Sequence, residues 1–344
     1  MNFRQHQDKA KKNTSHLMKL FTMMVLIASS VLGAISATAL IYQLESMASL
    51  KPELLRDIIY VQQFWLIFAS CSGIIALIFF CSYFISKRSN KDGHRVALAM
   101  GGIAEKDIKD NKELGLAYQQ LKNIVEEISL AAAIKPPSLY IIDDDAINAF
   151  AAGAEEGGYV IGVTVGAMDA FNREQMSGVI AHEVGHIVNR DVNLNVKIAA
   201  CVTTFSGLYI LGRIAIEPYG DRKHPAVMII GLALVIVGLL TQFMGSIIQA
   251  ATSRQREYLA DASAVQFTRY PDGIKEALEI INGSREPNTQ LSSAKAGGYS
   301  HAFIFGFKQK SLMSTHPPTE DRIKRLSGLI KKKAKQVKPK KAAW

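Results

Sequence analysis

Two histidines four residues apart, with a glutamate after the first, are the residues of this chain best placed to do chemistry. The stretch VIAHEVGHIVNRD (179–191) puts His182 and His186 on one face of a helix, where both imidazoles can bind a single metal ion. Glu183 can reach a water held by that ion. Zinc lowers the pKa of such a water, and a carboxylate takes its proton as the water attacks a carbonyl. The pattern predicts a zinc hydrolase; the alternative is an amphipathic helix with two surface histidines.

A site of this kind needs a third ligand, and the stretch SRQREYLADASAVQ (253–266) offers the best candidate. Glu257 and Asp261 lie four residues apart on one face of a predicted helix. We expect Glu257 to bind the metal, and Asp261 to accept a hydrogen bond from a ligand imidazole and fix its tautomer. The alternative is a charged helix face, because Arg254 and Arg256 lie beside these carboxylates.

The segments before the motif predict a small sheet followed by a capped helix. SLYIID (138–143) and YVIGVTVGAM (159–168) have the composition of strands. Asn172 and Gln175 have the spacing of a capping box, which would start the helix that carries the two histidines. At the other end of that helix, Asp191 is interpreted as a helix-end residue rather than as a metal ligand.

Long apolar blocks indicate a membrane protein. Residues 21–44 and 64–85 carry no charged side chain, and each is long enough to cross a hydrocarbon core as a helix. Because a second spanning block follows, the first is not interpreted as a cleaved signal peptide. After the motif, residues 226–251 form a strong candidate, whereas 198–212 is shorter than the usual span of about 20 residues. This later pair either spans the membrane or packs as a buried hairpin.

The distribution of basic residues predicts the orientation. Five Lys or Arg residues precede the first block and four follow the second between residues 87 and 95, but the connecting loop has two. By the positive-inside rule, both termini and the polar part of the chain face the cytoplasm. The histidines and Glu257 lie on either side of residues 198–251, so they can meet only if the chain crosses the membrane an even number of times between them. The sequence therefore predicts a hairpin there.

Composition restricts the remaining possibilities. All three cysteines lie within apolar blocks, which excludes a disulfide framework and a thiolate zinc site. The formal net charge of +10 comes largely from the two termini, and no nucleic-acid-binding motif accompanies it. We expect the lipid bilayer as a partner and no nucleic acid. The basic termini either contact anionic lipid headgroups or are simply solvated.

The predicted organisation alternates polar and apolar segments. It comprises a basic cytoplasmic N-terminus (1–20), a transmembrane helix (21–44), an external loop (45–63), a second transmembrane helix (64–85), the first part of a cytoplasmic metalloprotease domain (86–197), the apolar hairpin (198–251), the second part of that domain (252–330) and a disordered basic tail (331–344). The Ser- and Gly-rich stretch 282–314 is either a substrate loop or a surface segment.

Four motifs together resemble one family. HEVGH, REYLAD (256–261), NAF (148–150) and THPPTEDRI (315–323) are similar to those of the HtpX-like membrane zinc metalloproteases, bacterial relatives of the Ste24 CAAX-processing proteases. The resemblance covers most of the chain. It implies an α-helical membrane protein with a mainly α, gluzincin-like α+β protease domain that carries a small β-sheet. It also implies a multi-pass protein of the bacterial inner membrane, whose cytoplasmic domain cleaves membrane proteins, often damaged ones, under envelope stress.

The resemblance assigns the residues of the metal site. It implies that one zinc ion per chain is held by His182, His186 and Glu257. It makes Glu183 the general base, and Asp261 the partner of a ligand histidine.

The resemblance also implies roles outside the ligands. Asn148, Ala149 and Phe150 would belong to an edge strand that pairs with an extended peptide or membrane-protein substrate, a form of β-augmentation. His316 and Arg322 match a late motif that stabilises the active site or the developing oxyanion. On chemistry alone, a structural role explains His316 equally well.

Three other functions fit parts of the pattern. An intramembrane protease is disfavoured because charged residues flank HEVGH too closely for a spanning helix. A CAAX protease in the strict sense would carry more spans. A non-catalytic zinc-binding scaffold would use a fourth protein ligand, and nothing in the chain supplies one, so an open water position is the simpler expectation.

Overall fold

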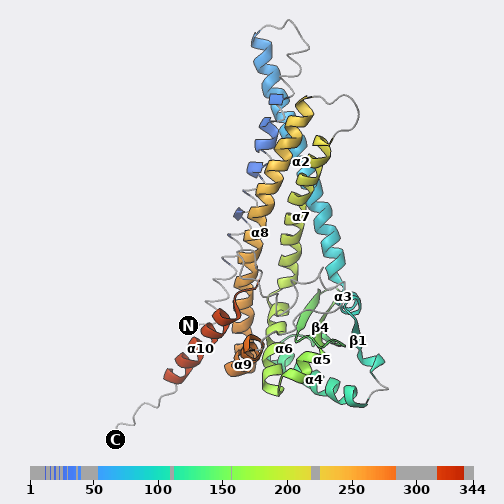
Figure 1. Cartoon of the computed structure of the whole chain (residues 1–344), viewed down its shortest axis with the longest axis vertical. Helices are drawn as coiled ribbons and strands as arrows, with labels where there is room; N and C mark the ends of the chain where they lie inside the picture. The colour runs from blue at the N-terminus through green and yellow to red at the C-terminus, as the bar shows by residue number, and fades with distance from the viewer. Residues whose placement is uncertain are drawn as a thin grey trace. The chain divides into compact units, whose positions relative to one another are not determined.

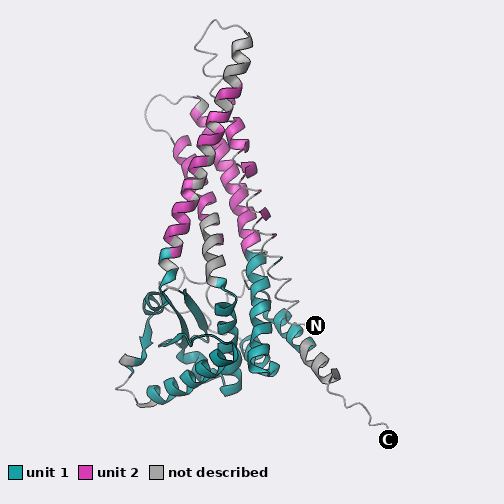
Figure 2. Cartoon of the chain, turned by 180° about the vertical axis from the view of Figure 1, so that it is seen from behind, with its two compact units in different colours: residues 1–12, 88–195, 250–344 teal, residues 13–87, 196–249 magenta. Residues whose placement is uncertain are grey.

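The computed structural model describes residues 53–108, 112–155, 157–217, 225–283 and 316–336, together with scattered positions between 12 and 39. These residues are mostly helical and include one small mixed sheet, as expected (Figure 1). The chain divides into two compact units, each assembled from separate stretches of sequence (Figure 2). Unit 1 comprises residues 1–12, 88–195 and 250–344, and unit 2 comprises residues 13–87 and 196–249.

The sheet of unit 1 has four strands in the order β1-β2-β4-β3. β2 and β4 run parallel, whereas β1 pairs antiparallel with β2, and β3 pairs antiparallel with β4. In that last pair, Ala151 lies opposite Ile161. β3 is therefore an edge strand. The strands are β1 (Gly102–Ala104), β2 (Ser138–Ile142), β3 (Ala149–Ala154) and β4 (Gly158–Thr164).

Both predicted strands are present, but the second is shorter than the sequence suggested. β4 ends at Thr164, and the following residues form the short helix α5 (Val165–Ala170). Thr164 is the N-cap of α5, because its side chain accepts a hydrogen bond from the Ala167 N–H. The β-branched composition favoured one long strand, but this cap and the small residues after it allow a helix to begin.

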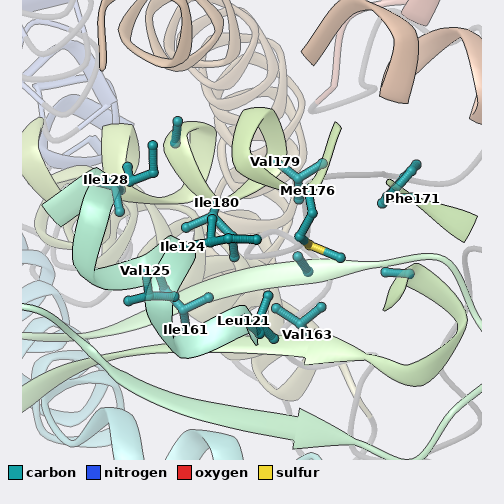
Figure 3. Close-up of a cluster of buried hydrophobic side chains, with 14 of the residues drawn as sticks. Leu121, Ile124, Val125, Ile128, Ile161, Val163, Phe171, Met176, Val179 and Ile180 are labelled. Carbon is teal, nitrogen blue, oxygen red and sulfur yellow. The ribbon is translucent and has the colours of Figure 1, made fainter. Parts of the chain in front are cut away.

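Apolar side chains cover both faces of the sheet. On one face, Ile124 of α4 and Ile180 of α6 belong to the same buried cluster as Ile161 and Val163 of β4 (Figure 3). On the other face, Val96 and Ala97 of α3 and the C-cap residue Met100 pack against the strands. The helices of unit 1 are α3 (Gly93–Ala99), α4 (Lys112–Ala131), α5, α6 (Arg173–Val188), α9 (Pro271–Gly283) and α10 (Thr319–Gln336), with the short 3-10 helix η1 (Glu105–Asp107) and one end each of α2, α7 and α8.

Unit 2 contains most of three long helices, α2 (Glu53–Lys91), α7 (Asp191–Ile216) and α8 (Pro225–Thr268). Within this unit α7 and α8 pack as an antiparallel pair over close glycine contacts. A Cβ added at Gly212 would lie 2.7 Å from Val235 N, and one added at Gly238 would lie 2.6 Å from Tyr209 N. Small residues allow this backbone approach between apolar helices. The two apolar blocks after the motif therefore form a hairpin.

Many large apolar side chains of unit 2 are exposed, among them Trp65, Phe80 and Leu240. By length and composition, Val227–Thr268 is the one described helix that could cross a membrane, and Val202–Ile216 is apolar but shorter. A surface of this kind is unusual for a protein surrounded by water on all sides.

Two predicted boundaries differ from the structure, and three predicted segments lie wholly or partly outside the described residues. α2 begins at Glu53, within the predicted external loop, because an acidic residue after a proline favours a helix start. α10 continues to Gln336, so the predicted disordered tail begins as helix; lysine is a good helix former there. Half of the residues in 21–44, the greater part of 282–314 and residues 337–344 lie outside the described residues.

Candidate metal centre

α6 holds the two histidines in the arrangement that their spacing predicted. The helix starts at the expected capping box, in which the Asn172 side chain accepts from the Gln175 N–H and the Gln175 side chain accepts from the Asn172 N–H. One turn apart, His182 and His186 bring their Nε2 atoms to within 3.1 Å of each other. His182 is fully buried, whereas the side chain of His186 is 17% exposed.

Gly185, between the histidines, allows α8 to pass close to α6. A Cβ added at this position would lie 3.0 Å from Ser263 Cβ and 3.3 Å from Ala260 Cα, both on α8. One turn before Ala260, α8 carries Glu257, which is 4% exposed. The glycine of HEVGH thus lets a helix far away in the sequence bring its carboxylate to the histidines.

Three ligand atoms converge at this point. His182 Nε2 lies 3.6 Å from Glu257 Oε2, and His186 Nε2 lies 3.7 Å from Glu257 Oε1. All three groups offer atoms within 4.8 Å of one another, and no other described residues form such a group. Tetrahedral zinc with bonds of about 2.0–2.1 Å separates its ligand atoms by about 3.3 Å. The donor set and its spacing therefore fit a zinc ion with one position left open.

Carboxylates fix the orientation of both imidazoles. His182 Nδ1 lies 2.9 Å from Asp261 Oδ1, and His186 Nδ1 lies 2.6 Å from Asp191 Oδ2. Because each Nδ1 is engaged, each Nε2 is directed to the candidate metal. Asp261 is the partner that the sequence predicted. Asp191 is indeed a helix-end residue, as the first residue of α7, but it also supports His186; its place just after the motif helix was the available clue.

Arg322 lies between two of these carboxylates. Its Nε and Nη2 donate to Asp261 at 2.9 and 2.6 Å, and its Nη1 lies 3.1 Å from Glu257 Oε2. Burial would raise the pKa of each carboxyl, but nearby positive charges outweigh it: His316 and Arg322 for Glu257, and Arg322 for Asp261. Arg322 is 2% exposed, and these contacts hold its guanidinium between the two carboxylates.

His316, near the start of the motif THPPTEDRI (315–323) that also contains Arg322, lies close to the metal centre. Its Nδ1 lies 3.5 Å from Glu257 Oε1, and its side chain is 10% exposed. It is not among the residues whose ligand atoms converge. The structure thus places His316 beside the third ligand without making it part of the donor set.

Glu183 is buried beside the ligands without belonging to them. Its side chain is 1% exposed, and no side chain of the described residues forms a hydrogen bond with its carboxylate oxygens. Burial raises the pKa of Glu183 to about 8, although His186 and the Ala151 backbone amide of β3 lower it. A buried carboxyl that no side chain engages and whose pKa lies near neutrality is suited to accept and return a proton.

The predicted edge strand lies next to this carboxyl. Asn148 precedes β3, and its Oδ1 accepts from the Ala149 N–H. Ala149 is buried in the main core, whereas Phe150 is buried on the opposite face of the sheet, among the residues packed by α3. The side chain of Phe150 therefore points away from the core that contains α6. β3 therefore meets the site through its backbone, since the Ala151 amide is one of the groups that lower the pKa of Glu183.

Comparison with known proteins identifies relatives of the chain. The model for peptidase family M48 matches residues 116–330. A protein named protease HtpX homolog from Dictyoglomus turgidum is 35% identical over 283 residues, which cover 78% of this chain and 88% of that relative. One of the same name from Caldanaerobacter subterraneus subsp. tengcongensis is 36% identical, with 75% and 86% covered.

Among solved structures, the crystal structure of S. mikatae Ste24p is similar to part of the chain. It is 20% identical, with a TM-score of 0.40, over 60% of this chain and 49% of Ste24p. This likeness is too distant to support an argument about the site.

Proposed function

This chain belongs to peptidase family M48 and is a metalloprotease related to the HtpX homologues, and on that premise we propose that it cleaves membrane proteins at the cytoplasmic side of a bacterial inner membrane. The observation that carries the proposal is the convergence of His182, His186 and Glu257 beside the buried carboxyl of Glu183. Damaged or misfolded membrane proteins are the proposed substrates.

We assign the proton transfers to Glu183. One zinc ion per chain, held by the two histidines and Glu257, would supply Lewis acidity and lower the pKa of the attacking water. Glu183 takes a proton from this water and returns it to the amine nitrogen of the leaving peptide. Burial raises its pKa to about 8, which matches a group that must both accept and release a proton near neutral pH.

We assign the positioning of the substrate to the edge strand β3. Its outer side is not paired with another strand among the described residues, and the backbone of Ala151 faces the Glu183 carboxyl. An extended peptide that adds to this edge would bring its scissile carbonyl towards the metal through main-chain hydrogen bonds alone. Binding through main-chain hydrogen bonds depends little on the side chains of the substrate. It favours segments that can adopt an extended conformation, as segments of damaged proteins do.

The membrane assignment is supported by the surface of unit 2 and by the charge distribution. Exposed apolar side chains on α2, α7 and α8 suit lipid tails. The basic segments beside the first two apolar blocks favour cytoplasmic termini and a cytoplasmic protease domain. The lysine-rich C-terminal end would contact anionic headgroups, each lysine contributing about 1 kcal/mol near the surface.

The test separates catalysis from metal binding. In purified full-length protein, Glu183→Gln should retain one zinc and lower the rate of cleavage of a membrane-protein substrate by about 100- to 10,000-fold. Glu174→Gln, an exposed change in the first turn of α6, should leave both properties unchanged. Glu257→Ala should lose the metal. Full activity of Glu183→Gln would overturn the assignment of the base, and undiminished zinc affinity of Glu257→Ala would place the third ligand elsewhere.

A further inference from the structure

One buried ion pair adjoins the metal centre without a part in the chemistry described above. Asp191, the first residue of α7, is 3% exposed. Its Oδ2 lies 2.6 Å from His186 Nδ1, and its Oδ1 forms an ion pair with Arg256. The side chain of Arg256 is 12% exposed, and this residue immediately precedes Glu257 on α8.

The turn between α6 and α7 directs Asp191 towards His186. Asn189 is the C-cap of α6, and its side-chain amide donates to Gly185 O at 2.8 Å. Arg190 follows with a φ of 56°, in the left-handed region that costs a non-glycine residue free energy. A backbone of this kind persists where its surroundings require it. Here it lets the first residue of α7 face the last turns of α6.

Arg256 connects this turn to α8. Besides its ion pair with Asp191, its Nη2 lies 3.4 Å from Asn189 O. Its Nε and Nη1 are buried without hydrogen-bond partners among the described residues, so Asp191 is the charge that compensates the guanidinium. A buried pair of this kind is weak evidence for stability, and removing one partner leaves an uncompensated buried charge. A role in positioning explains why such a pair lies beside a ligand.

We propose that Asp191 and Arg256 form a positioning clamp, which presents His186 Nε2 to the metal and joins the start of α7 to α8 beside Glu257. The proposal rests on the proposed function, because His186 must be a metal ligand. Asp191 accepts the Nδ1 proton and so leaves the Nε2 lone pair for the metal. Arg256 holds the carboxylate in place. Neither residue contacts substrate, so both are positioning residues.

The clamp links metal binding to the packing of the two helices. One ligand lies five residues before Asp191, and another follows Arg256 directly. A metal ion that holds both ligands therefore favours the closed clamp, and by linkage the closed clamp favours the metal. Loss of either clamp residue should loosen the start of α7 and the adjoining turn of α8 even when no metal is present.

The experiment measures metal affinity rather than activity. Full-length Asp191→Asn, Arg256→Met and the double variant are titrated with zinc against a chromophoric chelator, and their cobalt complexes are compared by absorption. The matched controls are Asp169→Asn, an exposed aspartate of α5, and Arg173→Met, an exposed arginine of α6. Asp191→Asn and Arg256→Met should each weaken zinc binding by about 10-fold and alter the cobalt spectrum, and the controls should do neither.

The double variant distinguishes a clamp from two separate effects. Because both residues act through His186, the double variant should bind zinc about as weakly as Asp191→Asn alone. Amide exchange in metal-free protein should rise at residues 191–195 and 250–257 in all three variants. If Arg256→Met does not fold, Arg256→Lys, which retains the charge but not the forked donors, replaces it and should show a smaller loss of affinity.

The outcomes separate this proposal from the proposed function. Wild-type protein that binds no zinc overturns both. Wild-type protein that binds zinc, with clamp variants of unchanged affinity and cobalt spectrum, overturns the clamp alone. Variants that are less stable but bind zinc normally once folded also overturn it, since the ion pair would then be merely structural.

Discussion

The two ligand histidines are supported by matching devices in different surroundings. Each Nδ1 meets an aspartate, and each aspartate meets an arginine. On the His182 side, the supporting residues come from α8 and α10, and the histidine is fully buried. On the His186 side, they come from α7 and α8, and the side chain is 17% exposed.

The difference lies in how many buried charges depend on one cation. Arg322 compensates two carboxylates, Asp261 and Glu257, whereas Arg256 compensates Asp191 alone. A buried charge destabilises the fold when its partner is removed, so the loss of Arg322 would leave more uncompensated charge than the loss of Arg256. His186 is the more exposed of the two ligand histidines. We therefore expect the loss of the arginine on the His182 side to lower stability more than the loss of the arginine on the His186 side.

The largest effect is expected from Arg322→Met. This change leaves two neighbouring carboxylates buried without their cation and should lower the free energy of unfolding by about 3–5 kcal/mol. Thermal unfolding of metal-free protein, with Arg256→Met for comparison and the exposed Lys324→Met as control, measures it. Equal stability of the Arg322 and Arg256 variants would contradict the asymmetry between the two sides.

A smaller effect is expected from the aspartates. Asp261→Asn should weaken zinc binding by about 100-fold and Asp191→Asn by about 10-fold, because only Asp261 shares its arginine with a ligand. Zinc titration of the two variants side by side decides the order. A greater loss from Asp191→Asn would reverse the comparison and make the His186 side the dominant support.

The third effect is a dependence of zinc affinity on pH that belongs to the His186 side. Burial would lower the pKa of His186, but Asp191 outweighs it and raises the pKa from 6.5 to about 9. Burial lowers the pKa of His182. A proton on His186 competes with the metal, so zinc affinity should fall as pH drops below about 9, by about tenfold per unit. Affinities measured from pH 6.5 to 9 should show a shallower slope for Asp191→Asn; an unchanged slope would remove Asp191 as the cause.

Local sequence patterns predicted the short-range features well. The capping box of α6, the strands β2 and β4 and the helix pair after the motif all appear in the structure. Each depends on residues close together in the chain or on a simple apolar period. The end of β4 was wrong, because Thr164 caps a helix within a stretch whose composition favours a strand.

Residues that act across long sequence distances were harder to predict. The sequence assigned Asp191 to a helix end and gave Arg256 a place only in the alternative of a charged helix face, yet the two form one buried ion pair. Arg322 was identified only through a family resemblance, because 65 residues separate it from Glu257. No spacing rule connects such positions. Only the packing of α8 and α10 brings them together.

The sequence by itself determined the donor types, their helical spacing and the need for a hairpin between them. These follow from the turn of a helix and from the coordination chemistry of zinc, which are the same in every fold. Tertiary structure alone decided which carboxylate supports which histidine, which arginine compensates it and how open each side is. Those properties depend on distances between helices and on the removal of charges from water, and neither is encoded in any short stretch of the chain.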